Sequence, residues 1–296
     1  MKIPVSYVHV EEVFTRKVIE PFVEAYLRGF TPNPCVVCNQ IIKFDYLLRH
    51  ADEEGVAFVA TGHYAVITKS AGSPAELWRG KDQSKEQSYF LHRLEQRHLL
   101  RTVLPLGEMT KVEARQLAAK MNLPTVLEAE SQEICFVPGE DYRLFLEKTK
   151  GMRIANRGNI VTKEGEKVGE HLGAYRFTIG QRHGLGIASP MPYYVMEIRP
   201  EKNEVVVGRK EDLLTTLVEA ELFNWLDGKP PAQGARVLGQ IRYRHIPGPG
   251  RLKEITPGEV KFEFKEPQWA ITPGQALACY DGKRLLGGGW IKKVQG

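Results

Sequence analysis

The pattern of apolar and polar positions changes character about halfway along the chain. In the first half, apolar residues recur at helical spacing over residues 11–28 and again from residue 34 onward, which predicts two amphipathic helices. Residues 5–10 alternate weakly and residues 56–60 form a short apolar run, so both predict strands, the second one buried. Strands that alternate with helices indicate an α/β domain with a parallel sheet.

The helix expected from residue 34 carries two cysteines at its start. Asn33 is a good N-cap residue, and Pro34 suits the first helical position, where a missing N–H does no harm. Cys35 and Cys38 then lie one turn apart on one face. Unpaired N–H groups and the positive end of the helix dipole favour thiolate over thiol there. The pair is therefore a candidate nucleophile, and the alternative is that each cysteine is a small buried apolar residue.

Later signals give the domain organisation. Thr110 and Glu113 form a capping box that opens a helix to about Met121, and residues 88–91 fit the start of another helix. Beyond about residue 150, Gly residues, turn pairs and short alternating runs replace helical spacing, and Asp281-Gly282 predicts a hairpin. We therefore expect an α/β domain over residues 1–144, a small β-rich domain over residues 145–205 and a C-terminal β-barrel over residues 206–296.

Composition and charge narrow the class of protein. The apolar, charged and aromatic fractions (42%, 26% and 9%) are those of a globular protein, and no run approaches the ~18 apolar residues of a membrane helix. The N-terminus lacks the basic and apolar regions of a signal peptide. Four cysteines in 296 residues do not make a disulfide scaffold, so a reducing cytoplasm is expected. Residues 205–296 hold 14 basic and 10 acidic side chains, +4 of the net +5, which permits a polyanionic partner.

Two further cysteines bear on what the first pair can do. Zinc needs a second pair or a histidine at ligand spacing, and Cys135 and Cys279 are solitary, so no bound metal is expected. A thioredoxin-like redox motif also fits the CxxC spacing, although here it follows Asn-Pro rather than a strand. Cys135 lies among strand-like residues and is a core residue on its own. Paired in space with Cys38, it could instead pass sulfur as a persulfide and close to a disulfide.

Two stretches suggest contacts with a nucleotide or with RNA. Gly62 and His63 follow the strand predicted at residues 56–60, where open α/β sheets bind ligands; a surface histidine without a role is the alternative. Residues 242–245 (RYRH) interleave cations with an aromatic ring, which suits RNA or, equally, a solvated face of a barrel strand. No GxxxxGK[ST] or SGGxDS-type phosphate loop occurs in the sequence.

Taken together, nine stretches resemble, in order, those of the tRNA-specific 2-thiouridylases of the MnmA type. They are TPNPCVVCNQIIKF, ATGHYA, KEQSYFL, LPLGEMTKVEAR, SQEICFV, YRFTIGQRHGLGI, RYRH, TPGQ and LGGGWI. The resemblance implies a partial adenine-nucleotide alpha-hydrolase-like domain, a β-rich tRNA-binding domain and a barrel. It also implies thiolation of C2 of the wobble uridine in tRNAs for Glu, Gln and Lys. ATP with Mg²⁺ would activate the uracil oxygen, and a persulfide donor protein would supply sulfur.

The resemblance also implies roles for single residues. Cys135 corresponds to the cysteine that receives sulfur as a persulfide, and Cys38 to the nucleophile that attacks it and leaves a Cys38–Cys135 disulfide. Gly62 corresponds to a nucleotide contact. The other matching positions correspond to contacts with tRNA or its target base: Asn33, Pro34, Cys35, His63, Lys85, Glu86, Gln87, Arg242, Tyr243 and Gln275.

The chain departs from the family pattern at three places. Cys35 stands where some members carry an acid–base Asp, and Glu86 stands where Asp is usual. The family's first strand and SGGVDS pyrophosphatase loop come before the stretches matched here, so we expect the main ATP-binding loop to be absent. On that expectation the isolated chain needs a separate N-terminal fragment to act. The alternative function is that of a non-catalytic tRNA-binding remnant or of one half of a split enzyme.

Overall fold

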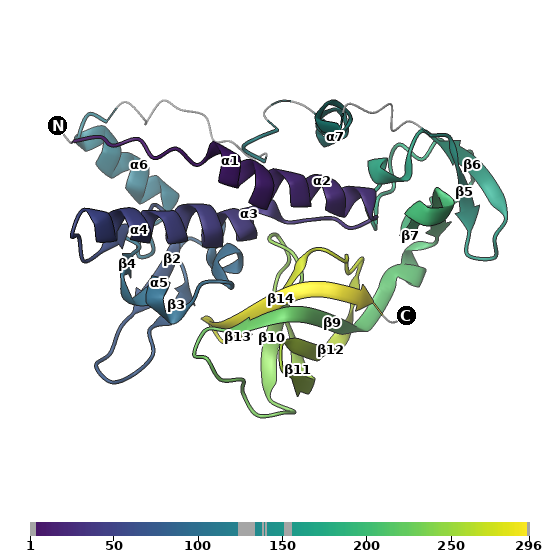
Figure 1. Cartoon of the computed structure of the whole chain (residues 1–296). Helices are drawn as coiled ribbons and strands as arrows, with labels where there is room; N and C mark the ends of the chain where they lie inside the picture. Colours follow the sequence, from purple (N-terminus) through teal and green to yellow (C-terminus); the bar gives the residue numbers. More distant parts are fainter. Residues whose placement is uncertain (1–3, 124–133, 138, 140, 151–155, 295–296) are drawn as a thin grey trace.

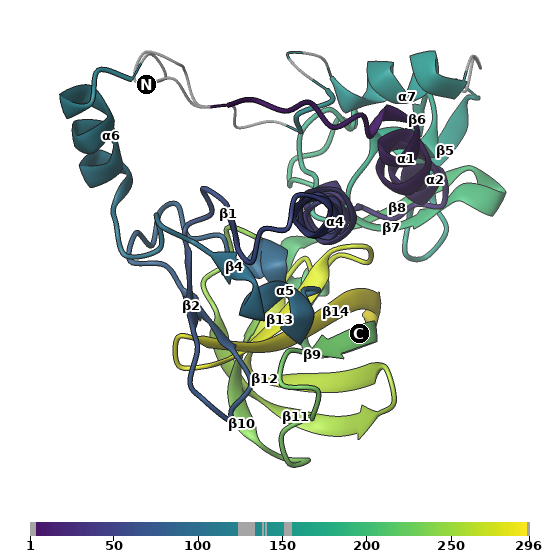
Figure 2. The same cartoon turned by 60° about the vertical axis from the view of Figure 1, so that its left-hand side comes forward.

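The computed structural model describes residues 4–123, 134–137, 139, 141–150 and 156–294. Two long helices lie side by side above the C-terminal barrel (Figures 1 and 2). The first runs through α1 (Glu11–Phe14), a π-helical segment η1 (Thr15–Ile19) and α2 (Glu20–Leu27), and the second through α3 (Pro34–Val37), a π-helical segment η2 (Cys38–Asp45) and α4 (Tyr46–Glu53). The sequence predicted both helices and neither π segment.

The parallel sheet of the first domain is small. It consists of β1 (Val59–Ala60) and β4 (Thr102–Val103), paired in parallel. The predicted strand over residues 56–60 is therefore shorter and less buried than expected, since Val56 and Phe58 are 48% and 55% exposed. The strand predicted over residues 5–10 is wrong, because residues 4–10 have no regular structure and pair with no strand among the described residues, and Tyr7 is 87% exposed.

The remaining helices of the first domain follow local signals. Thr110 caps α6 (Lys111–Lys120) as predicted: its side-chain oxygen accepts from the Glu113 backbone N–H, and the Glu113 carboxylate accepts from the Thr110 N–H. Residues 88–91 form only a short 3₁₀ helix, η3 (Ser88–Leu91). The other two helices of this part are α5 (Gln96–Leu100) and α7 (Tyr142–Lys150).

A closed antiparallel barrel forms the C-terminal part of the structure. Its strands are β9 (Leu214–Trp225), β10 (Arg236–Gln240), β11 (Gly248–Thr256), β12 (Glu259–Trp269), β13 (Ala276–Asp281) and β14 (Arg284–Val294), and pairing of β13 with β14 closes the ring. The predicted hairpin joins β13 to β14. A second hairpin, β2 (Ala65–Thr68) and β3 (Glu76–Arg79), adds to β14 from the first domain, which the sequence did not predict. The first domain and the barrel thus share one sheet.

The middle of the chain forms a separate four-stranded sheet, in the strand order β6-β5-β8-β7. Its strands are β5 (Gly158–Thr162), β6 (Lys167–His171), β7 (Tyr194–Arg199) and β8 (Glu204–Gly208). Short 3₁₀ helices accompany them: η5 (Ala174–Arg176), η6 (Pro200–Lys202) and η7 (Lys210–Leu213). The buried face carries Ile160, Val195, Val205 and Val207. An α/β part followed by β-rich parts confirms the predicted fold class.

Candidate functional site

The barrel fixes the start of the cysteine-bearing helix. The Thr31 N–H donates to the Pro273 carbonyl (3.0 Å), and the Gln275 side chain donates to the Thr31 carbonyl (3.0 Å). Gly274 makes this approach possible, because its φ is +90° and a Cβ there would lie 3.0 Å from the Thr31 carbonyl oxygen. Residue Asn33 takes the N-cap position as predicted, but its buried side chain makes no capping hydrogen bond.

Cys35 and Cys38 stand one turn apart on this helix, and a lysine accompanies them. Cys35 is exposed and Cys38 is half-buried; both are free thiols. Cys38 begins η2, in which backbone hydrogen bonds run from residue i to i+5, so Lys43 comes to the same side as Cys38. Lys43 is exposed, and its side chain has no hydrogen bond or ion pair within the part of the chain that the structure describes. Sequence reasoning missed Lys43 because helical periodicity assumes 3.6 residues per turn.

The ionisation of these thiols differs from expectation. Desolvation raises the pKa of Cys38 above the ordinary thiol value, Lys43 lowers it, and Cys135 and Cys35 raise it again. Desolvation likewise raises the pKa of Cys35, against a lowering by Lys43. The expectation that the helix start favours thiolate is therefore wrong in its net effect. Loss of solvent around the thiolate raises the pKa by more than the helix start and Lys43 lower it.

Cys135 lies within electrostatic reach of both cysteines, since its charge raises the pKa of each. It was predicted to lie among strand residues, but it occupies an exposed turn closed by a hydrogen bond from Val137 N–H to the Ile134 carbonyl (2.8 Å). Phe136 anchors that turn through edge-on contacts with Phe14 and Phe22 and a tilted contact with Phe145. The structure thus joins two segments about a hundred residues apart in one thiol cluster: Cys35, Cys38 and Cys135. Residues 131–133 of the SQEICFV stretch lie outside the described part.

His63 is buried beside this helix rather than exposed. Its Nε2 donates to the Asn39 side-chain oxygen (3.1 Å) and its Nδ1 accepts from the Thr61 hydroxyl (2.8 Å). Burial lowers the pKa of His63 to about 4, with a further lowering by Lys43, so the ring is neutral at pH 7. Asn39, which the sequence did not single out, links this histidine to η2 and to the Phe90 carbonyl.

Six of the predicted tRNA contacts line one groove between the first domain and the barrel. These are Lys85, Glu86, Gln87, Arg242, Tyr243 and Gln275, in a hollow of about 1160 Å³. Its other charged lining residues are all cationic: Arg79, Lys111 and Arg244. Five cations against one carboxylate make the groove a site for a polyanion. Residues 242–245 form a turn after β10, because Gln240 donates to the carbonyls of Arg242 and Tyr243 and turns the chain; the alternative of a solvated face on a barrel strand is therefore wrong.

Hydrogen bonds, an ion pair and a cation–π contact join the residues at the floor of the groove. The Arg79 guanidinium donates to Gln240 (2.8 Å), lies 3.6 Å from the Glu86 carboxylate and stacks over the Tyr280 ring. Glu86 is only 6% exposed, and burial raises the pKa of its carboxyl. Gln87 exchanges hydrogen bonds with the Tyr64 backbone (2.9 Å each). Glu86 and Gln87 thus shape the groove from below, whereas Tyr243 packs on Phe90 at its side.

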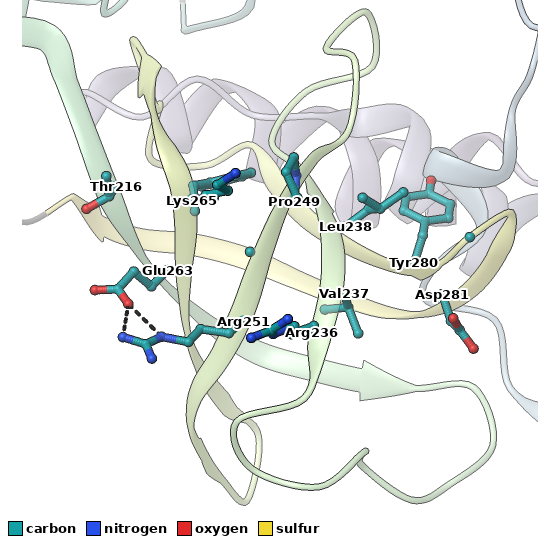
Figure 3. A pocket seen from close by; sticks show the side chains of 13 residues that line it. Thr216, Arg236, Val237, Leu238, Pro249, Arg251, Glu263, Lys265, Tyr280 and Asp281 are labelled. Atoms are coloured by element: carbon teal, nitrogen blue, oxygen red, sulfur yellow. Dashed lines mark hydrogen bonds and ion pairs between the residues drawn. The ribbon is translucent and has the colours of Figure 1, made fainter.

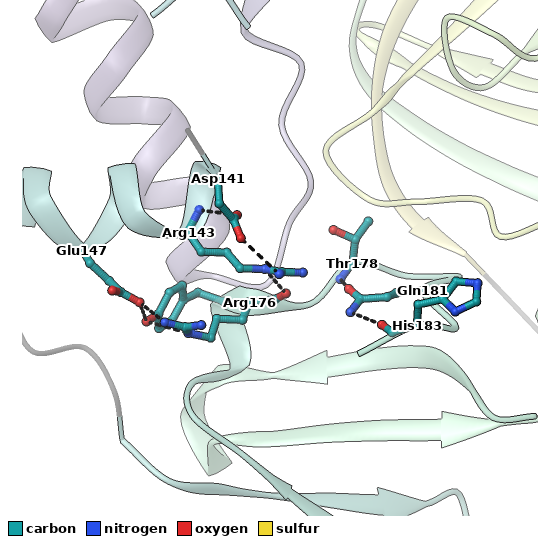
Figure 4. Close-up of polar contacts among 8 residues, drawn as sticks. Asp141, Arg143, Glu147, Arg176, Thr178, Gln181 and His183 are labelled. Atoms are coloured by element: carbon teal, nitrogen blue, oxygen red, sulfur yellow. Dashed lines mark hydrogen bonds and ion pairs between the residues drawn. The ribbon is translucent and has the colours of Figure 1, made fainter. Parts of the chain in front are cut away.

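Two other features lie near the predicted residues without including them. A hollow of about 910 Å³ on the barrel is lined by residues of β9 to β13 and contains the Arg251–Glu263 ion pair (Figure 3). Figure 4 shows two separate sets of polar contacts. In one, Arg143 of α7 donates to the Arg176 carbonyl (3.0 Å); in the other, Gln181 donates to the His183 carbonyl (2.8 Å). The first set attaches α7 to η5.

Among the described residues, no group of three or more His, Cys, Asp and Glu side chains could hold a metal ion. Gly62 is exposed just after β1, the place where an open α/β sheet binds a ligand. No helix in the described ranges is both long and apolar enough to cross a membrane.

Comparison with known proteins covers nearly the whole chain. The chain matches the family models for a tRNA methyl transferase HUP domain (residues 1–139), a tRNA methyl transferase PRC-barrel domain (residues 144–209) and an aminomethyltransferase beta-barrel domain (residues 215–291). It is 49% identical to the tRNA-specific 2-thiouridylase MnmA of Carboxydothermus hydrogenoformans, over 98% of this chain and 80% of that relative. The MnmA proteins of Geobacter metallireducens and Geotalea uraniireducens are 46% and 45% identical, over 98% and 99% of this chain and 78% and 77% of their own lengths.

Proposed function

The chain belongs to the family of tRNA-specific 2-thiouridylases, which are tRNA sulfurtransferases, and we propose that it replaces the C2 oxygen of the wobble uridine with sulfur in tRNAs for Glu, Gln and Lys. The observation that carries the proposal is the thiol cluster. Cys38 and Cys135, distant in sequence, lie within electrostatic reach of each other. Two such thiols can hold and release one sulfur atom. Because tRNA is the proposed substrate, we propose that the protein acts in the cytoplasm.

The proposed sulfur transfer uses each thiol once. A donor protein leaves Cys135 as a persulfide on its exposed turn. The Cys38 thiolate attacks the inner sulfur of that persulfide, the terminal sulfur leaves as hydrosulfide, and a Cys38–Cys135 disulfide remains. The hydrosulfide then adds to C2 of the adenylated uracil, and the C2 oxygen leaves as part of AMP. Lys43 stabilises the attacking thiolate, which counters the desolvation of Cys38.

The cationic groove supports tRNA as the partner. Lys85, Arg242 and Arg244 offer charges to phosphates, and the Tyr243 ring on Phe90 offers a surface for stacking. We propose that Asn33, Pro34 and Cys35 meet the extruded uridine, because the barrel holds Thr31 in place just before them. His63 then acts through Asn39 rather than by direct contact with RNA, since both ring nitrogens are occupied.

Activation of the uracil by ATP needs a phosphate-binding loop beside Gly62. We propose that such a loop, with its Mg²⁺, packs against the β1–β4 pair. A parallel pair is normally covered on both faces, and here Val56, Phe58 and Val103 are exposed. A co-expressed N-terminal fragment of a relative, carrying the SGGxDS loop, tests this proposal by restoring adenylation.

The experiment for the whole function is a thiolation assay. The chain, alone and with that fragment, is mixed with tRNA, ATP and a persulfide donor, and 2-thiouridine is measured by mass spectrometry. We expect Cys38→Ser and Cys135→Ser to abolish product and Cys279→Ser, which changes a buried barrel residue, to retain it. If Cys38→Ser thiolates like the parent chain, the proposed chemistry is wrong. If tRNA binds but is never thiolated, the chain is a tRNA-binding protein.

A further inference from the structure

Cys35 is a third thiol beside the two that the proposed reaction uses. It is exposed and lies three residues before Cys38 on the same helix. It also shares its electrostatic neighbours with Cys38, because Lys43 and Cys135 act on both thiols. Three sulfur atoms from two segments therefore gather where sulfur transfer needs only two.

The geometry allows the three thiols to exchange partners. Residues i and i+3 of a helix have Cβ atoms about 5–6 Å apart, and a disulfide needs about 3.5–4.5 Å, so a small shift of the first helical turn joins Cys35 to Cys38. Cys135 stands on a turn whose neighbours, Ile134 and Phe136, are held by the aromatic cluster. Cys38 belongs to both possible pairs, because it lies one helical turn from Cys35 and within electrostatic reach of Cys135.

We infer that Cys35 is the resolving cysteine of this enzyme, a role that rests on the proposed function. After sulfur transfer, the Cys35 thiolate attacks the Cys38 sulfur of the Cys38–Cys135 disulfide. The Cys35–Cys38 bond forms, the Cys38–Cys135 bond breaks, and Cys135 leaves as a thiolate that takes a proton from water. This exchange involves no net oxidation or reduction.

The exchange has a direct consequence for turnover. Cys135 is then a free thiol again and can accept the next persulfide sulfur. The disulfide now joins Cys35 to Cys38 and can be reduced later. An external dithiol then attacks the exposed Cys35 sulfur, forms its own disulfide and leaves Cys35 and Cys38 as thiols.

Disulfide mapping of the full chain tests the inference. The protein is oxidised with one equivalent of diamide, quenched in acid, alkylated and digested with trypsin. Residues 29–43 form one tryptic peptide that holds both helix cysteines, and residues 121–143 hold Cys135. In the parent chain we expect a disulfide within the first peptide and an alkylated Cys135. In Cys35→Ser we expect a Cys38–Cys135 link and a loss of Cys135 alkylation.

Two results would overturn the inference. One is a Cys38–Cys135 disulfide that persists in the parent chain, and the other is equal protection of Cys135 in parent and variant. Cys279 provides the control for folding, because it is fully buried and reacts only in misfolded protein; Cys35→Ala serves if Cys35→Ser fails that control.

The assay also separates this inference from the proposed function. With limiting dithiol, the ratio of later turnovers to the first turnover should be lower in Cys35→Ser than in the parent chain, whatever the change in the first turnover itself. Equal multiple turnover by the variant and the parent chain would contradict the inference. The proposed function fails if neither the parent chain nor any variant thiolates tRNA. The exchange still stands in that case if the disulfide of the parent chain moves to the CxxC pair.

Discussion

Single residues control the reactivity of the thiol cluster through charge and solvent. Cys279 shows the extreme, because complete burial in β13 raises the pKa of its thiol far above the ordinary range. Cys38 is intermediate: desolvation raises the pKa of its thiol, and Lys43 opposes that rise. The cation and the thiols lie together only because η2 is a π-helical segment.

Replacing Lys43 by Met should slow alkylation of Cys38. Without the cation the pKa of the thiol rises further, so less thiolate is present at pH 7.5, and we expect a rate lower by about fivefold. The measurement is the rate of iodoacetamide labelling of Cys38 against pH. Lys43→Arg keeps the charge and serves as the control. Equal rates for Lys43→Met and the parent chain would show that Lys43 does not act on Cys38.

His63 should make the stability of the protein depend on pH. Its folded pKa is about 4 against 6.5 in the unfolded chain, so between these values the unfolded state binds a proton that the folded state rejects. Stability is therefore full above pH 6.5 and falls as the pH drops, by about 2 kcal/mol between pH 7.5 and 5 for this group. Urea unfolding of His63→Gln should show that much less pH dependence. His9→Gln, at an exposed histidine, should leave it unchanged.

At the scale of elements, the TPGQ loop before β13 positions the first turn of the cysteine-bearing helix. Its contacts with Thr31 cross from the barrel to the first domain over more than two hundred residues of sequence. The loop reaches Thr31 because residue 274 is a glycine in the left-handed region. The aromatic contacts of Phe136 do the same for Cys135. Both thiol segments are therefore placed by packing outside the site.

Gly274→Ala should destabilise the protein more than a glycine substitution without a close neighbour. Left-handed strain and the clash with Thr31 and Phe30 together should cost about 3 kcal/mol in urea unfolding. Gly282→Ala, at φ +59° with nothing within 4 Å, carries only the backbone strain of about 1 kcal/mol. If the two variants are equally stable, the contact with Thr31 does not restrain the helix start.

At the scale of the whole molecule, the shared sheet forms the cationic groove. Addition of β2–β3 to β14 brings Arg79 and the segment after it against the barrel turn that holds residues 242–245. Residues from both parts then line one cationic hollow. Neither the first domain nor the barrel alone presents this surface.

Arg242→Ala should weaken tRNA binding in a salt-dependent way. Loss of one phosphate contact should lower the affinity about tenfold at low salt and reduce the slope of log K against log[salt] by about 1. Filter binding over a range of KCl concentrations measures both. Lys229→Ala removes an exposed cation outside the groove-lining set and should change neither. An unchanged slope in Arg242→Ala would mean that the groove does not contact phosphates through this residue.

Much of the fold was predictable because its signals are local. The capping box at Thr110, the N-cap position of Asn33 and the β13–β14 hairpin each depend on a few neighbouring residues, and the structure confirms them. The predicted strand at residues 5–10 is wrong because a strand needs a partner strand, and none lies beside these residues in the part of the chain that the structure describes. Residues 242–245 turn because the Gln240 side chain donates to the carbonyls of Arg242 and Tyr243, a contact that alternation of residue types does not indicate.

The sequence by itself determined that Cys35 and Cys38 stand one turn apart at a helix start, since i and i+3 positions follow from helix geometry. It also determined the family, through nine ordered stretches. Only the tertiary structure decided that Cys135 joins them, that Lys43 faces them and that the thiol pKa values rise. Proximity between remote segments and loss of solvent arise from packing of the whole chain, and no local pattern records either.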